Sequence, residues 1–140
     1  MAISGRFRVS MGEVFPCGAF VVGEVEAVRD FDKSTRDRAV QAKDRDTGEL
    51  VWSVPVLDAD ESAPKGMKTV VVKISAPVQP VPPEAVEVAG MKFRPVEFEG
   101  LMVTPYVDDK RNRVAYSLRA TGMHAPTRGV KGLGEGKSAA

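Results

Sequence analysis

The stretch Val96–Thr121, VEFEGLMVTPYVDDKRNRVAYSLRAT, decides the fold class. It contains two runs in which apolar and polar residues alternate, Val96–Val107 and Arg113–Thr121, and the polar turn Asp108–Asn112 separates them. One side of the second run carries Val114, Tyr116, Leu118 and Ala120. Because successive side chains of a strand point to opposite faces, this pattern predicts two antiparallel strands joined by a tight turn.

Three earlier runs show the same alternation: Gly18–Phe31, Leu50–Leu57 and Lys68–Ala76. Gly23 inside the first run predicts a bulge or a bend. Pro55 lacks an amide proton, so the second strand should lie at a sheet edge or contain a bulge there. Short strands separated by clusters of Gly, Pro, Asp and Asn, with the turn Asp44–Gly48 before the second of these runs, predict an all-β domain.

Two segments complete the expected element order. Pro83–Gly90 begins with a proline and ends with a glycine, which predicts one short helix, and Phe7–Phe15 is expected to add an N-terminal strand. Five strands, a helix between the third and fourth, and a glycine bend in the first are the order of an OB-like five-stranded barrel. A small β-sandwich of six strands would give much the same pattern, so the closure of the sheets stays open.

Length and composition set the outer limits. A chain of 140 residues fits one domain, and we expect residues 1–124 to form a single β-barrel domain. Residues 125–140 are rich in glycine and are expected to form a flexible tail. No apolar run approaches the roughly 20 residues that cross a bilayer, so we expect a cytoplasmic protein without membrane contact.

The reactive residue types are too few for most catalytic chemistry. Cys17 and His124 are the single cysteine and the single histidine, which excludes an internal disulfide and a Cys/His metal cluster. No nucleophile, base and orienting group converge in the sequence. We therefore expect a non-enzymatic protein without metal, cofactor or catalytic residues.

The charge is balanced overall but not along the chain. The formal net charge is +1, yet residues 1–100 hold 13 Lys/Arg and 16 Asp/Glu, and residues 101–140 hold 7 and 3. The basic excess therefore lies in the last hairpin and the tail. Such an asymmetry is typical of a nucleic-acid interface, and equally of a solubilising tail.

Aromatic and basic residues interleave on the predicted strands and hairpin loops. Single-stranded nucleic acid binds to rings that stack bases and to cations that follow phosphates. The alternation favours core positions for Trp52 and Tyr116, whereas Phe31 and Tyr106 lie at strand ends and are better placed to stack. The candidate nucleic-acid-binding residues are Phe31, Lys43, Arg45, Trp52, Lys73, Tyr106, Lys110, Arg111, Arg113, Tyr116 and Arg119.

Several long segments resemble one known family. They are GEVFPCGAFVVGEVEAVRDFDKST (Gly12–Thr35), VWSVPVLDAD (Val51–Asp60), VKISAPVQPVPP (Val72–Pro83), FRPVEFEGLMVTPYVDD (Phe93–Asp109) and RVAYSLRATGM (Arg113–Met123). In these segments the chain is similar to the activators of replication, integration and excision encoded by actinobacterial plasmids. The resemblance implies a role in mobile-element DNA biology and mobile-element replication or transfer proteins as partners. It assigns no functional residue.

The element order also resembles, more loosely, that of bacterial OB-fold single-stranded-DNA-binding proteins, although this chain ends in GLGEGKSAA without their acidic tail. Together these features predict an accessory protein of an actinobacterial plasmid or integrative element that binds single-stranded DNA. The alternative is an activator of replication, integration and excision genes that acts through duplex DNA or protein contacts. A third interpretation is a β-domain that assembles only with proteins. Exposed strand edges predict a homo-oligomer.

Overall fold

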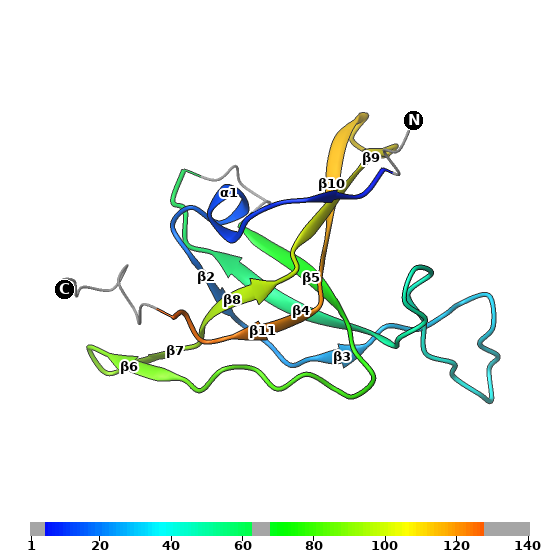
Figure 1. Ribbon diagram of the computed structural model, residues 1–140, viewed down its shortest axis with the longest axis horizontal. Helices are drawn as coiled ribbons and strands as arrows, with labels where there is room; N and C mark the ends of the chain where they lie inside the picture. The colour runs from blue at the N-terminus through cyan, green and yellow to red at the C-terminus, as the bar shows by residue number, and fades with distance from the viewer. Residues whose placement is uncertain (1–4, 63–67, 128–140) are drawn as a thin grey trace.

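The computed structural model describes residues 5–62 and 68–127. They form a curled nine-stranded sheet, a separate two-stranded hairpin and one short helix (Figure 1). The elements are β1 (Phe7–Arg8), α1 (Met11–Val14), β2 (Ala19–Val21), β3 (Glu26–Ala27), β4 (Val51–Asp58), β5 (Thr69–Ser75), β6 (Val86–Val88), β7 (Met91–Phe93), β8 (Pro95–Glu99), β9 (Met102–Asp108), β10 (Arg113–Ala120) and β11 (Gly122–His124).

The strand order makes the sheet curl back on itself. It runs β1-β9-β10-β5-β4-β2-β8-β11, with β3 also paired to β4. Strands β8 and β9 are consecutive in the chain, yet β8 pairs with β2 while β9 pairs with β10. Strand β10 runs parallel to β5, and the other pairs in the sheet are antiparallel. The predicted all-β, OB-like fold is confirmed, with one curled sheet around the core.

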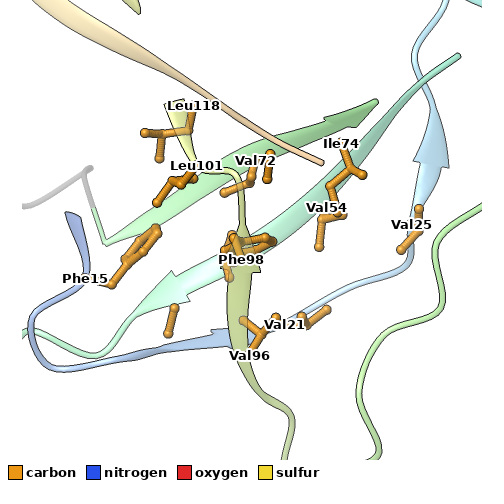
Figure 2. Close-up of a cluster of buried hydrophobic side chains, with 13 residues drawn as sticks. Phe15, Val21, Val25, Val54, Val72, Ile74, Val96, Phe98, Leu101 and Leu118 are labelled. Carbon is orange, nitrogen blue, oxygen red and sulfur yellow. The ribbon is translucent and has the colours of Figure 1, made fainter. Parts of the chain in front are cut away.

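The core lies inside this curl, where alternate residues of each strand meet (Figure 2). Val54 and Val56 of β4 pack there with Val72 and Ile74 of β5, and all four are fully buried. Phe98 of β8 adds an aromatic ring to the core, and its ring centroid lies 6.4 Å from that of Phe15. The period-2 pattern of the sequence thus corresponds to real burial in the barrel strands.

The first predicted strand is broken where the sequence has Gly23. Val21 pairs with Val56 but Glu26 pairs with Ser53, so the β2–β3 segment carries two extra residues opposite β4. A Cβ on Gly23 would lie 2.7 Å from Cγ of Pro55. The bulge predicted at Gly23 is confirmed. Of the two alternatives predicted for the strand of Pro55, an edge position or a bulge, the edge position is wrong, and the bulge lies in the partner segment opposite Pro55. Strand β4 lies between β2–β3 and β5 in the sheet. Pro55 has no amide proton to donate to a neighbouring strand, and the bulge at Gly23 lies against Pro55, so the sheet needs no hydrogen bond from Pro55 there.

The helix predicted at Pro83–Gly90 is wrong. Residues 86–93 form the β6–β7 hairpin, in which Val86 pairs with Phe93 and Val88 with Met91. Its two turn residues, Ala89 and Gly90, both have positive φ, 52° and 79°. Two consecutive left-handed residues are typical of a tight hairpin turn, and the flanking valines favour strands.

The extra N-terminal strand is also shorter than predicted. Of Phe7–Phe15 only Phe7–Arg8 forms a strand, and Met11–Val14 is the helix α1. The Ser10 hydroxyl accepts a hydrogen bond from the Glu13 amide, while the Glu13 carboxylate accepts one from the Ser10 amide. This capping box starts a helix in a segment whose alternation alone indicated a strand.

The end of the predicted domain lies at the last described strand. Strand β11 ends at His124, and residues 128–140 of the predicted tail fall outside the described residues. Within residues 5–62 and 68–127, no helix has the length and apolar character that crossing a membrane requires.

Candidate nucleic-acid interface

An open groove of about 650 Å³ lies where strands β5 and β10 separate. Strand β10 pairs with β5 only over Leu118–Ala120, so its first half diverges from the start of β5. Val70 and Val71 line one wall, and Tyr116 and Ser117 line the other. The groove follows from an incomplete parallel pairing.

Five of the eleven predicted nucleic-acid-binding residues line this groove. Lys73 comes from β5, and Arg119 is its direct partner on β10. Their neighbours in sequence, Ile74 and Leu118, are buried, so both cations lie on the outer face of the sheet. The groove-lining predicted residues are Arg45, Lys73, Tyr106, Tyr116 and Arg119.

Two tyrosines stand on the β9–β10 hairpin, whose residues 104–117 extend beyond the barrel and are called the arm below (Figure 1). Tyr106 is 51% exposed and Tyr116 is 59% exposed. The expected core position of Tyr116 is therefore wrong. Tyr116 has the same phase as buried Leu118, but it lies past the end of the β5 pairing, where no strand of the described residues covers it.

The carboxylate of Asp44 links side chains from three segments at one end of the groove. It is 4% exposed, and its Oδ2 lies 3.2 Å from Nη1 of Arg119, 3.4 Å from Nη1 of Arg6 and 2.9 Å from Oγ of Ser75. Its Oδ1 accepts hydrogen bonds from the amides of Asp46 and Thr47. Asp44 thus links the β3–β4 loop (residues 28–50) to the segment before β1, to β5 and to β10.

This network sets the charge states around the groove. Burial alone would raise the pKa of the Asp44 carboxyl, but hydrogen bonds from Asp46, Ser75 and Thr47 and the charge of Arg6 outweigh it and hold the pKa below its usual value. Burial also lowers the pKa of Arg119, with Asp44 opposing that effect. Both groups are charged at neutral pH because ordinary arginine and aspartate titrate far from it.

The other predicted residues do not reach the groove. Lys110, Arg111 and Arg113 lie at the tip of the arm. Phe31 and Lys43 lie on the β3–β4 loop, where Phe31 is 81% exposed and the Arg29 guanidinium lies 5.9 Å from its ring centroid. Trp52 packs against the core, and its Nε1 donates a hydrogen bond to the carbonyl of Ala76.

Sequence reasoning missed several residues of the groove. Arg6 comes from the segment before β1, and the polar side chains Thr104 and Ser117 come from the arm. Thr104 and Ser117 form a cross-strand pair, so the register of the hairpin could have placed them on the face of Tyr106. The contribution of Arg6 depends on β1 pairing with β9, which alternation within β1 does not reveal.

A second depression, of about 600 Å³, contains none of the predicted residues. It lies between β2 and the β6–β7 hairpin, and its lining includes Phe20, Leu57 and Phe93. Among the described residues no group of three or more His, Cys, Asp or Glu side chains is arranged to hold a metal ion. The groove is therefore the place where the predicted chemistry gathers.

No protein-family model, curated protein or solved structure matches the chain. The resemblance to plasmid activators stays a prediction from the sequence segments.

Proposed function

We propose that this protein binds single-stranded DNA in the groove between β5 and β10. The observation that carries the proposal is that Tyr106, Tyr116, Lys73, Arg45 and Arg119 line one groove. The groove lies between the β3–β4 loop and the arm, which are the loops that flank the ligand face in OB-folds.

The chemistry of the groove suits a single strand. Bases in a duplex are already stacked on each other, whereas a single strand can stack its bases on exposed tyrosines. Each stacked base contributes about 1–3 kcal/mol. Arg45 and Lys73 form no ion pair with any carboxylate in the described part of the chain, so both are available to phosphates. Tyr106 pairs with Ala115 and Tyr116 with Pro105, so the two rings lie on opposite faces of the hairpin and Tyr106 shares the face of Arg119. One ring on the face of the cations and a second on the other face predict modest affinity that weakens as salt rises.

The biological role that fits this chemistry is that of a non-enzymatic accessory protein of an actinobacterial plasmid or integrative element, acting in replication or transfer. This part of the proposal rests on the sequence resemblance. We also propose self-association, because the arm exposes Val107 and Val114, which are paired on one of its faces.

Fluorescence anisotropy with labelled oligothymidine and a labelled duplex, at low and high salt, tests the proposal. Tyr106→Ala should weaken single-strand binding about fivefold to 150-fold, which corresponds to one lost stacking contact of about 1–3 kcal/mol. Phe31→Ala is the matched control, because Phe31 is an exposed ring outside the groove. No binding of oligothymidine at low salt, or an equal loss in both variants, would overturn the assignment to the groove.

A second candidate function is duplex binding by the tip of the arm. Lys110, Arg111 and Arg113 project there on a two-stranded ribbon, and such ribbons fit the major groove of B-DNA. The combined variant Lys110→Ala/Arg111→Ala should then weaken duplex binding, while Tyr106→Ala should leave it unchanged. Preference for the oligothymidine over the duplex would count against this candidate.

A further inference from the structure

The two aspartates near the groove hold their arginine partners very differently. Asp44 is buried and has five polar partners, two of them arginines. The side chain of Asp46 is 70% exposed, and its one described side-chain partner is Arg6, at 2.9 Å between Oδ2 and Nη1. The amide of Asp46 is bound to Asp44, so the backbone is fixed while the carboxylate is free to turn away.

We propose that Arg6 is a phosphate subsite of the groove and that the Asp46 carboxylate occupies it until nucleic acid displaces it. This inference rests on the proposed function and adds a competitor built into the same site. A carboxylate and a phosphodiester present similar paired oxygens to a guanidinium, so one can replace the other on Arg6.

Separating the carboxylate from its arginine requires little free energy at Asp46 and much more at Asp44. An exposed ion pair contributes about 0–1 kcal/mol, because water solvates both partners once they separate. Removing Asp44 from its partners would leave buried donors unsatisfied and would release the β3–β4 loop. Arg6 therefore exchanges Asp46 for a phosphate while Asp44 continues to hold both Arg6 and Arg119 in place.

The exchange makes the groove more positive. The cations are Arg6, Arg45, Lys73 and Arg119, and the anions are Asp44 and Asp46, which gives four minus two, or +2. When Asp46 turns into solvent, the cations are opposed by Asp44 alone and the local charge becomes +3. Ligands with a single weak phosphate contact must compete with Asp46, so the arrangement favours a polyanion that reaches several cations together.

The test compares oligothymidine affinity, by fluorescence anisotropy, in matched variants. Asp46→Asn should bind up to about fivefold more tightly, because an exposed ion pair contributes at most about 1 kcal/mol. Asp37→Asn is the control, because it adds the same unit of charge on the same loop and Asp37 forms no hydrogen bond or ion pair to a described residue. Arg6→Ala should bind more weakly and reduce the salt slope by about 0.7, the value for one single-strand phosphate contact.

The decisive comparison is the double variant Arg6→Ala/Asp46→Asn, with thermal unfolding of each protein to show that it is folded. If Asp46 competes for Arg6, the gain from Asp46→Asn falls to the level of the Asp37→Asn control once Arg6 is gone. A gain that persists without Arg6, or one no larger than the control, would overturn this inference while leaving the proposed function intact. Failure of the wild type and Asp46→Asn alike to bind oligothymidine would overturn the proposed function itself.

Discussion

Replacing Asp44 with asparagine should destabilise the protein more than any other single change of a carboxylate to an amide in the described residues. Asparagine keeps an oxygen for the amides of Asp46 and Thr47, but it removes the charge that faces Arg6 and Arg119. Breaking a fully buried pair costs about 3–5 kcal/mol. The two arginine side chains are 23% and 24% exposed and can turn partly into solvent, so we expect about 2–3 kcal/mol. Asp44→Ala loses the turn bonds too and should cost about 1–2 kcal/mol more.

Urea unfolding followed by the fluorescence of Trp52 measures this cost, since Trp52 is the single tryptophan and packs against the core. Asp30→Asn is the matched control. Asp30 lies on the same loop and its Oδ1 also accepts two backbone amides, from Asp32 and Lys33, but no ion pair joins Asp30 to a described residue. We expect the control to cost less than about 1 kcal/mol. Equal costs in the two variants would refute the role of the buried charge.

The pH dependence gives a second check on the same prediction. The folded-state pKa of Asp44 lies below its unfolded value, so the charged carboxylate stabilises the fold at every pH above the unfolded pKa of about 3.9. The difference in unfolding free energy between wild type and Asp44→Asn should therefore be constant near neutral pH. It should shrink as the pH falls below about 4 and through the folded-state value. A difference that changed between pH 6 and pH 8 would point to another group.

Three further substitutions test the fold around the groove. Phe98→Ala removes the ring that packs with Phe15 and should cost about 3–5 kcal/mol in urea unfolding; a loss below about 1 kcal/mol would contradict its core position. Gly100→Ala should lower the thermal stability by about 1–3 kcal/mol, because Gly100 has a φ of 62° and a Cβ would lie 2.7 Å from Oγ1 of Thr121. An unchanged melting temperature would contradict the bend between β8 and β9. Val114→Thr should change the stability of the monomer by less than about 0.5 kcal/mol, because Val114 is 53% exposed on the arm, but it should weaken the proposed self-association. Sedimentation velocity that shows the same assembly state for wild type and variant at every protein concentration would contradict a role of Val114 in self-association.

The sequence predicted the barrel strands well because their alternation corresponds to burial on one face. Val54 and Val56, and likewise Val72 and Ile74, follow the pattern and fill the core. The pattern could not show where a strand extends beyond the end of its pairing with the neighbouring strand. Tyr116 continues the apolar phase of Leu118, but its exposure is decided by the point at which β10 separates from β5.

The two helix errors have a common physical origin. The proline at the start and the glycine at the end of Pro83–Gly90 predicted a helix. Gly90 instead belongs to a two-residue hairpin turn, and Val86 and Val88 lie in the strand before it. In the N-terminal segment the signal was present, since Ser10 and Glu13 have the spacing of a capping box. At Pro83–Gly90 a local signal that fits both a helix end and a hairpin turn was assigned to the wrong one, and in the N-terminal segment the capping box outweighed the alternation.

The candidate site was predictable as a set of residue types but not as an arrangement. Arg119 and Lys73 are 46 positions apart in sequence and become neighbours only through the parallel pairing of β10 with β5. The sequence predicts only that Asp44 begins a turn, whereas the fold buries its side chain against two arginines. A net charge of +1 therefore says little about nucleic-acid affinity. Affinity depends on which cations in the groove are free. Buried Asp44 pairs with both Arg6 and Arg119, and the second partner of Arg6, the exposed Asp46, is the carboxylate that we propose a phosphate replaces.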